Sequence, residues 1–469
     1  MIQISLAEAA SALGGSLTLV AGTTPESTVS GSVQTDSRLV EPGSIFFALP
    51  GEETDGALFA GTAVEAGAAL IVAERELDVP VPVIVVPDGV VALAALARLV
   101  VARVRAHGKL RMAAVTGSNG KTTTKNLLQA ILAAQGPTVA PRESFNNHVG
   151  APISMLGVED DTEFLISEMG ASHIGEIARL VSIATPDVGV VLKVGLAHAG
   201  EFGGIEGVQL AKSEMVRDLP DTAVAVLNRD DPLVTQMQAM TAARVVWFGM
   251  HADAEVRAID IAATLDGTSF TLVVDGKHLP VTLRILGEHH VWNALAALAV
   301  AREFAVPLDA AIASIESVLR AERWRMELLP REDGIIVIND AYNASPDSTA
   351  AALKTLAQIT PPGRRTVAVL GEMAELGEYA QDEHDRIGRL AVRLNIGKLV
   401  VVGDRARHIH AAAGLEGSWD GESVLVTDPD AAYDLLREEL RPGDVVLVKS
   451  SKSAKLRFLG DRIAGVVAG

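Results

Sequence analysis

The 469-residue chain contains no cysteine, which excludes disulfide bonds and thiol catalysis. Aromatic residues make up only 4% of the chain, whereas apolar residues, with much alanine and valine, make up 49%. This composition favours helices packed over parallel sheets. No apolar run approaches the roughly 18 residues of a transmembrane helix. The first five residues lack the basic and apolar regions of a signal peptide. We therefore expect a cytoplasmic protein that does not bind membranes.

Positive charge is also scarce. The chain has 40 lysines and arginines against 59 aspartates and glutamates, a net charge of -19 at pH 7. A general nucleic-acid-binding surface needs clustered Lys and Arg side chains, so no nucleic-acid partner is expected. Small anionic ligands are still possible, because a local lysine, an arginine or a helix N-terminus can hold a phosphate inside an acidic protein.

The length suggests about three domains, at roughly 150 residues each. We predict an α/β domain at 1–108, a second domain at 109–322 and a third at 323–469. In the second, strand and helix patterns alternate, which predicts a mostly parallel sheet. Residues 254–286 instead carry alternating apolar residues and two Asp-Gly turns, which predicts a small antiparallel subsheet. The third block alternates again and is typical of a doubly wound, Rossmann-like domain.

The most informative motif is a glycine-rich turn between an apolar strand at 112–115 and a predicted helix. Its lysine can reach phosphate oxygens, its threonine hydroxyl can bind Mg2+, and the helix N-terminus faces the same anion. The pattern predicts an ATP site. The strict motif would have glycine where this chain has Val115, so a plain strand-to-helix turn is the alternative. The candidate ATP-binding residues are Gly117, Ser118, Asn119, Gly120, Lys121, Thr122 and Thr123.

Three polar residues follow predicted strands of the second domain. Thr122 follows the first strand, Glu168 follows a strand at 163–167, and His198 follows a strand ending near 194. Ligands of parallel sheets sit beyond the carboxyl ends of the strands, so these groups could together serve Mg2+ at phosphates. Taken singly, Glu168 could equally cap a helix and His198 could be an ordinary loop histidine.

Two residues in predicted helices have ordinary and functional interpretations. Lys212 lies in a predicted helix at 205–217, where lysines usually face solvent. Asn293 lies in an alanine-rich helix for which asparagine has low propensity. A specific hydrogen bond is therefore plausible there, to a nucleotide or to a neighbouring backbone group.

Polar groups also occur at the predicted domain boundaries and in the first domain. Arg325 could brace a transferred phosphate at an interdomain cleft. Asp340 begins a polar segment that could bind ribose, or could simply be a turn in which Ser345 and Pro346 start a helix. Arg38 could hold a diphosphate or form a surface salt bridge.

In combination, these segments resemble the Mur ligase family of peptidoglycan synthesis over nearly the whole chain. The segments that carry the resemblance are 35–49 (TDSRLVEPGSIFFAL), 116–122 (TGSNGKT), 144–152 (SFNNHVGAP), 168–177 (EMGASHIGEI) and 340–346 (DAYNASP). The family's phosphate loop also lacks the first glycine of the strict motif. The chain departs from the family at 448–455, where relatives often carry Gly-Ser-Arg.

The resemblance implies a UDP-substrate-binding domain, a central ATPase and a C-terminal ligase domain. It implies that ATP phosphorylates a peptide carboxylate, which an amine then attacks. The segment at 168–177 favours the members that join D-alanyl-D-alanine to UDP-N-acetylmuramoyl-tripeptide (UDP-MurNAc-tripeptide). The alternative is a member that adds the third amino acid, although the Asp-Asn-Pro-Arg run of those adding diaminopimelate is missing. We expect a monomer that acts on these small molecules.

The resemblance also assigns roles to individual residues. Lys121, Glu168, His198 and Lys212 would be catalytic. Thr122, Glu168 and His198 would bind Mg2+, and a carbamoylated Lys212 would present an anion to a second Mg2+. This replaces the solvent-facing interpretation of Lys212. The remaining assignments are ATP contacts by Asn293, Arg325 and Asp340, and UDP-substrate contacts by Ser37, Arg38, Asn146 and Asn147.

Outside this family, two other classes are possible. A GTPase switch would need an Asn-Lys-x-Asp motif, and the nearest string, at 228–231, lacks the lysine. A scaffold with a degenerate site would not need the intact Lys121, Thr122, Glu168 and His198.

Overall fold

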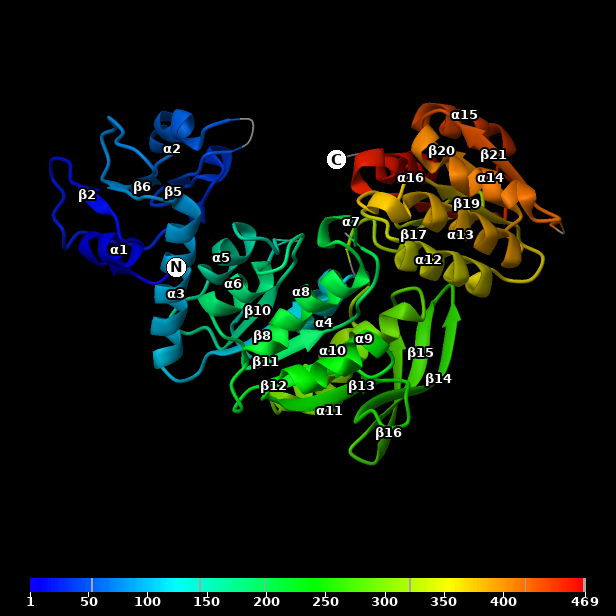
Figure 1. The fold of residues 1–469 in the computed structure, drawn as a ribbon, viewed down its shortest axis with the longest axis horizontal. Helices are drawn as coiled ribbons and strands as arrows, with labels where there is room; N and C mark the ends of the chain where they lie inside the picture. Colours follow the sequence, from blue (N-terminus) through cyan, green and yellow to red (C-terminus); the bar gives the residue numbers. More distant parts are fainter. Residues whose placement is uncertain (52–53, 143–144, 198, 320–321, 418, 467–469) are drawn as a thin grey trace.

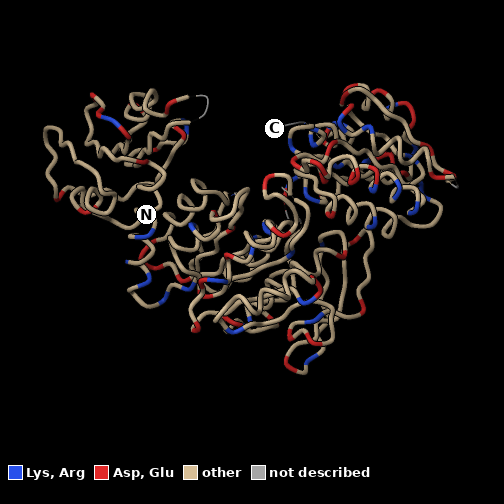
Figure 2. Tube along the Cα trace, viewed as in Figure 1, with Lys and Arg blue, Asp and Glu red and all other residues tan. Residues whose placement is uncertain are grey.

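The computed structural model describes residues 1–51, 54–142, 145–197, 199–319, 322–417 and 419–466. The elements form three α/β domains in chain order, as predicted (Figure 1). Acidic and basic residues are interspersed in all three domains (Figure 2). No helix within these ranges is both long and apolar enough to cross a membrane.

The first domain contains a five-stranded sheet in the order β2-β7-β6-β5-β4, in which only β2 and β7 pair antiparallel. Residues 56–65 form a 3-10 turn followed by a short α-helix. The elements are β1 (Ile4–Ser5), α1 (Leu6–Leu13), β2 (Ser16–Thr18), β3 (Thr28–Val29), β4 (Val33–Gln34), η1 (Ser37–Leu39), β5 (Ile45–Ala48), η2 (Gly56–Phe59), α2 (Ala60–Glu65), β6 (Leu70–Ala73), β7 (Val83–Val85) and α3 (Gly89–Ala106).

Helix α3 joins the first domain to the second. Asp88 caps its N-terminus by accepting a hydrogen bond from the Val91 backbone at 2.9 Å. Its buried face includes Leu93, Leu96 and Val100. The helix contacts both α1 of the first domain and α5 of the second, so a single apolar core runs across the junction.

The second domain is built on a nine-stranded sheet in the order β16-β15-β14-β13-β12-β11-β8-β10-β9. In this spatial order, every neighbouring pair between β14 and β9, including those of β8, is parallel. Strands β14, β15 and β16 form the predicted antiparallel subsheet. The strands are β8 (Arg111–Thr116), β9 (Thr138–Val139), β10 (Phe164–Glu168), β11 (Val188–Val191), β12 (Val224–Asn228), β13 (Arg244–Gly249), β14 (Val256–Thr264), β15 (Gly267–Val274) and β16 (Lys277–Leu283).

Helices cover this sheet on both faces (Figure 1). Helix α10 is buried almost all round because its alanines allow close approach to the sheet and to α4. The helices are α4 (Lys121–Ala133), α5 (Gly150–Met155), α6 (Glu176–Ile183), α7 (Ala199–Phe202), α8 (Ile205–Arg217), α9 (Pro232–Thr235), η3 (Gln236–Met240), α10 (His289–Glu303) and α11 (Leu308–Glu316).

The third domain has a six-stranded sheet in the order β17-β18-β22-β19-β20-β21, parallel except for the edge strand β17. It is the predicted Rossmann-like domain. Its elements are β17 (Glu327–Pro330), β18 (Ile336–Asn339), α12 (Pro346–Ile359), β19 (Thr366–Leu370), η4 (Gly377–Tyr379), α13 (Ala380–Arg393), β20 (Lys398–Val402), η5 (Asp404–Ala406), α14 (Arg407–Leu415), β21 (Glu422–Val426), α15 (Pro429–Glu439), β22 (Val445–Lys449), η6 (Lys452–Ala454) and α16 (Leu456–Ala464).

Candidate active site

The phosphate-loop motif forms a tight turn between β8 and α4. Gly117 and Gly120 have φ angles of 150° and 89°, conformations that favour glycine. The Lys121 ammonium donates a hydrogen bond to the Gly117 carbonyl at 2.8 Å, inside the turn. Burial lowers the pKa of Lys121, and the nearby Glu168 carboxylate opposes that shift. The turn thus brings the Lys121 side chain and the N-terminus of α4 to one point.

Glu168 is the last residue of β10 and is fully buried. It therefore ends a strand and does not cap a helix. One carboxylate oxygen, Oε1, accepts a hydrogen bond from the Asn146 side-chain amide at 2.7 Å. The other, Oε2, accepts none from the described part of the chain. Leaving a buried charged oxygen without a partner is costly, so a cation at this position fits the site.

The other predicted metal ligands are only partly placed. Thr122 is buried in the first turn of α4, beside Lys121. His198 lies outside the described residues. Within the described ranges, no three His, Asp or Glu side chains cluster closely enough to hold a metal ion unaided. A cation beside Glu168 would therefore also need ligands of other kinds, such as a hydroxyl or nucleotide phosphates.

Lys212, on α8, is only 3% exposed, so the solvent-facing interpretation is wrong. Burial and the nearby Lys121 lower its pKa to about 7, while Glu176 and Glu214 act in the opposite direction. Its ammonium nitrogen lies 5.4 Å from the centre of the Phe202 ring. A buried lysine with this pKa is substantially neutral at physiological pH, and a neutral amine is nucleophilic.

Asn293 lies against the phosphate loop. A β-carbon at Gly120 would collide with its side-chain oxygen, so only glycine fits at that point of the loop. Its side-chain nitrogen and the His290 Nδ1 are 3.1 Å apart. The neighbour of the Asn293 amide is thus a histidine side chain, which neither of the two interpretations of this residue included.

The third domain reaches the phosphate loop at the carboxyl edge of its sheet. The Ser345 hydroxyl donates to the Asn119 side-chain oxygen at 3.1 Å, and Lys193 lies 3.7 Å from Asp347. Ser345 also caps α12, with Pro346 in the first turn, as the turn interpretation predicted. These contacts bring the third domain against the phosphate loop of the second domain.

Asp340 is held by the protein on both oxygens. Its Oδ2 pairs with the buried Lys449 at 2.6 Å, and its Oδ1 accepts from the Met326 backbone at 3.1 Å. Lys449 ends β22 and was missed by the sequence analysis, although a lysine directly after four buried valines and leucines is an unusual pattern. The Arg325 guanidinium lies 4.3 Å from the centre of the Tyr342 ring. Lys449 thus holds Asp340 and the Tyr342 ring holds Arg325, and these are the two predicted ATP contacts at the domain boundary.

The connection that carries Arg325 is strained. The residues on either side of it, Trp324 and Met326, have φ angles of 59° and 50°. The Trp324 indole and the Arg323 guanidinium both donate to the buried Asp461 of α16 at 2.9 Å, and Asn339 donates to its other oxygen at 3.0 Å. Asp461 thus fixes the connection from the side of the third domain.

We expect Asp461→Ala to lower the free energy of unfolding by about 2–3 kcal/mol, since three donors lose a charged acceptor. Urea unfolding followed by tryptophan fluorescence would measure this change. Asp430→Ala is the matched control, because that carboxylate is 87% exposed and its pair with Arg462 should contribute little. Equal effects of the two substitutions would contradict the role of Asp461.

The predicted UDP-substrate contacts fall in two places. Asn146 lies beside Glu168, whereas Ser37 and Arg38 lie in the η1 turn of the first domain. Arg38 pairs with Asp36 at 2.6 Å and its side chain is 85% exposed, which is the surface salt bridge that the sequence left open. The Asn147 side chain accepts from the Gly150 backbone at 2.8 Å, at the start of α5.

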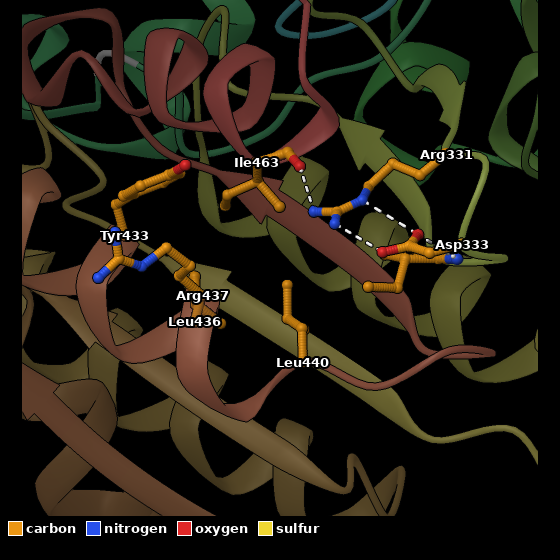
Figure 3. A pocket seen from close by; sticks show the side chains of 8 residues that line it. Arg331, Asp333, Tyr433, Leu436, Arg437, Leu440 and Ile463 are labelled. Carbon is orange, nitrogen blue, oxygen red and sulfur yellow. Dashed lines mark hydrogen bonds and ion pairs between the residues drawn. The ribbon is translucent and has the colours of Figure 1, made fainter.

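A cavity of about 210 Å³ in the third domain is separate from this site (Figure 3). It lies where β18 begins, whereas Asp340 follows the end of that strand. The Arg331 guanidinium in it is already paired with Asp333 at 2.6 Å and donates to the Ile463 carbonyl at 2.7 Å. The cavity is lined by Arg331, Asp333, Ile335, Tyr433, Leu436, Arg437, Leu440 and Ile463.

Comparisons with known proteins agree over the whole chain. Three family models match: the Mur ligase family catalytic domain at 31–110, the Mur ligase middle domain at 115–301, and the Mur ligase glutamate ligase domain at 324–452. The UDP-N-acetylmuramoyl-tripeptide–D-alanyl-D-alanine ligase of Mycobacterium tuberculosis is 44% identical, over 99% of this chain and 98% of its own length.

Solved structures agree with these models. MurF from Acinetobacter baumannii superposes with a TM-score of 0.89 at 28% identity, covering 99% of both chains. The MurF ligase from Thermotoga maritima, solved with ADP, has a TM-score of 0.81 at 28% identity, covering 93% of this chain and 97% of its own. The chain belongs to the Mur ligase family.

Proposed function

We propose that the chain uses ATP to join D-alanyl-D-alanine to UDP-N-acetylmuramoyl-tripeptide. The observation that carries this proposal is the 44% identity, along the whole chain, with a curated ligase of that activity. A phosphate loop beside the fully buried Glu168 supports it. The alternative, a ligase that adds the third amino acid, is not favoured, because the curated relatives over the full length are named for D-alanyl-D-alanine addition.

The proposed reaction has two steps. An oxygen of the tripeptide's terminal carboxylate attacks the γ-phosphorus of ATP, the bond to ADP breaks, and an acyl phosphate forms. The amine of D-alanyl-D-alanine then attacks the acyl carbon through a tetrahedral intermediate, which loses phosphate and a proton to leave the amide. Both steps bring anions together, so Lys121 would offset charge at the phosphates. Contacts such as that of Ser345 with Asn119 would help to exclude water from the acyl phosphate.

Mg2+ fits this site. Thr122, Glu168 and His198 would hold one ion, and a carbamate formed from Lys212 and carbon dioxide would present an anion to a second Mg2+. Two observations support that assignment: the Oε2 of Glu168 has no partner among the described residues, and the buried Lys212 has a low pKa. When bound, Mg2+ would neutralise phosphate charge and orient the phosphates for transfer. A carbamate would turn a buried cation into an anionic ligand.

The remaining predicted contacts keep their proposed roles. The loop residues Gly117 to Thr123, with Asn293, Arg325 and Asp340, would bind ATP, and Ser37, Arg38, Asn146 and Asn147 would bind the UDP-substrate. The division of the chain at 1–108, 109–322 and 323–469 follows the same scheme. We further propose a cytoplasmic monomer.

A phosphate-release assay tests the proposed function. Each UDP-tripeptide, with lysine or with diaminopimelate at its third position, is supplied with ATP, with and without D-alanyl-D-alanine. Phosphate release should require both the tripeptide and D-alanyl-D-alanine, and the preferred tripeptide identifies the natural third residue. Release with UDP-dipeptide and a single amino acid, but not with D-alanyl-D-alanine, would replace the proposal with the third-residue ligase.

A further inference from the structure

A second buried lysine lies beside the site and has no part in the proposed reaction. Lys125 is on α4, four residues after Lys121, so the two side chains share one face of the helix. It is 3% exposed, and its ammonium donates to the Pro141 carbonyl at 3.0 Å. Burying an ammonium is costly without a compensating interaction, and the Pro141 carbonyl supplies one for Lys125.

Charged groups of the site act on the pKa of Lys125. Burial lowers its pKa, Glu322 and Glu168 oppose that shift, and Arg325 adds to it. The lysine is therefore electrostatically coupled to the same carboxylate that the proposed function assigns to Mg2+.

Pro141 and Asn146 belong to one short stretch of chain, in which the Phe145 backbone donates to the Arg142 carbonyl at 3.4 Å. Five residues beyond Pro141, Asn146 donates its side-chain amide to Glu168 Oε1 at 2.7 Å. The Asn146 carbonyl accepts from the Gly170 backbone at 2.8 Å, just past Glu168. A β-carbon at Gly170 would lie 2.9 Å from the Asn146 side-chain carbon, so glycine is needed for this close packing. Asn146 is thus attached both to the acid itself and to the chain two residues beyond it.

We propose that Lys125 and Asn146 are positioning residues for Glu168. Asn146 occupies Oε1 and leaves Oε2 for the metal ion, and Lys125 anchors the segment that carries Asn146. Groups that hydrogen-bond a metal ligand in this way orient it and tune its affinity, and their loss typically weakens metal binding about 10–100-fold. The inference rests on the proposed function and gives Asn146 a role other than contact with the UDP-substrate.

Metal affinity provides a test that does not depend on turnover. Electron paramagnetic resonance measures the Kd of Mn2+ in the presence of ADP, and phosphate release measures the Mg2+ concentration for half-maximal activity. We expect Asn146→Ala to raise both values about 10–100-fold. Lys125→Met should raise them several-fold, and Lys125→Arg, which keeps a donor for Pro141, should recover most of that loss.

A double-mutant cycle tests whether the two residues act through one carboxylate. If Lys125 acts through Asn146, the double variant should bind Mn2+ no more weakly than Asn146→Ala alone. Lys398→Met is the matched control, since Lys398 is a buried lysine of the third domain paired with Glu422 at 2.7 Å and Glu439 at 2.6 Å. It should lower the melting temperature and leave the Mn2+ Kd unchanged.

Three outcomes would overturn the proposal. These are an unchanged Mn2+ Kd in folded Asn146→Ala, additive effects in the double variant, or a shift in Lys398→Met equal to that in Lys125→Met. Failure of the proposed function gives a different result, namely normal Mn2+ binding with no D-alanyl-D-alanine-dependent phosphate release. Lys125→Arg keeps the test informative if Lys125→Met does not fold.

Discussion

Lys121→Ala is expected to abolish most turnover, with kcat falling by about 10²–10³-fold. The lysine is the one cation within the phosphate-loop motif, and removing a preorganised group that stabilises developing charge typically costs 10²–10³-fold. Phosphate release with UDP-tripeptide and D-alanyl-D-alanine measures the effect. Little change in folding is expected, because the hydrogen bond that is lost goes to a loop carbonyl, Gly117.

Lys109→Ala is the control for that experiment. Its side chain is 74% exposed, and it precedes β8 on the same stretch of chain. It should keep wild-type activity and melting temperature. Near-normal activity of Lys121→Ala would remove the proposed role of the loop in phosphate transfer.

Lys212→Ala is expected to lose most activity and to regain part of it when a short carboxylate such as formate or acetate is added. The truncation leaves space in a buried position, and an added carboxylate can present there the anion that a carbamate would supply. The rescue distinguishes the modified lysine from a purely structural one, since packing alone would not respond to an anion. Full activity of Lys212→Ala would rule out the carbamate.

The control for rescue is Lys121→Ala, which the same carboxylates should not restore because a cation is missing there. The pH dependence provides a further check. Carbamate forms on the neutral amine, and a pKa of about 7 means that this form declines as the pH falls below 7. After removal of carbon dioxide, recovery at equal concentrations of dissolved carbon dioxide should therefore be faster at pH 8 than at pH 6.

Local patterns predicted the parts of the fold that depend on short stretches of chain. Helix α8 spans the predicted 205–217, and the antiparallel subsheet lies within 254–286. The apolar period is enough to specify the helix, and the alternating apolar residues with two Asp-Gly turns are enough to specify the subsheet. Other elements were missed, among them α1, the edge strand β17 and α16, although Ser5 caps the start of α1 and a left-handed Gly14 ends it.

The site shows the same division. Glycines, a lysine and a threonine within eight residues specify a phosphate loop, since the cradle is made by one turn of backbone. By contrast, Lys212 looked like a surface lysine, and nothing local marked Lys125 as buried. The apolar run before Lys449 did not show which group it pairs with. Their burial depends on neighbours far along the chain, as in the pair of Lys449 with Asp340.

The sequence by itself determined the three α/β domains, the phosphate loop and the family, because each is encoded in local periodicity or in a contiguous motif. Only the tertiary structure decided that Glu168 has one oxygen held by Asn146 and the other without a protein partner among the described residues. It also decided that Ser345 meets Asn119 across the domains. Such contacts join residues 22 and 226 positions apart, and burial and pKa depend on which distant groups the fold brings within a few ångströms.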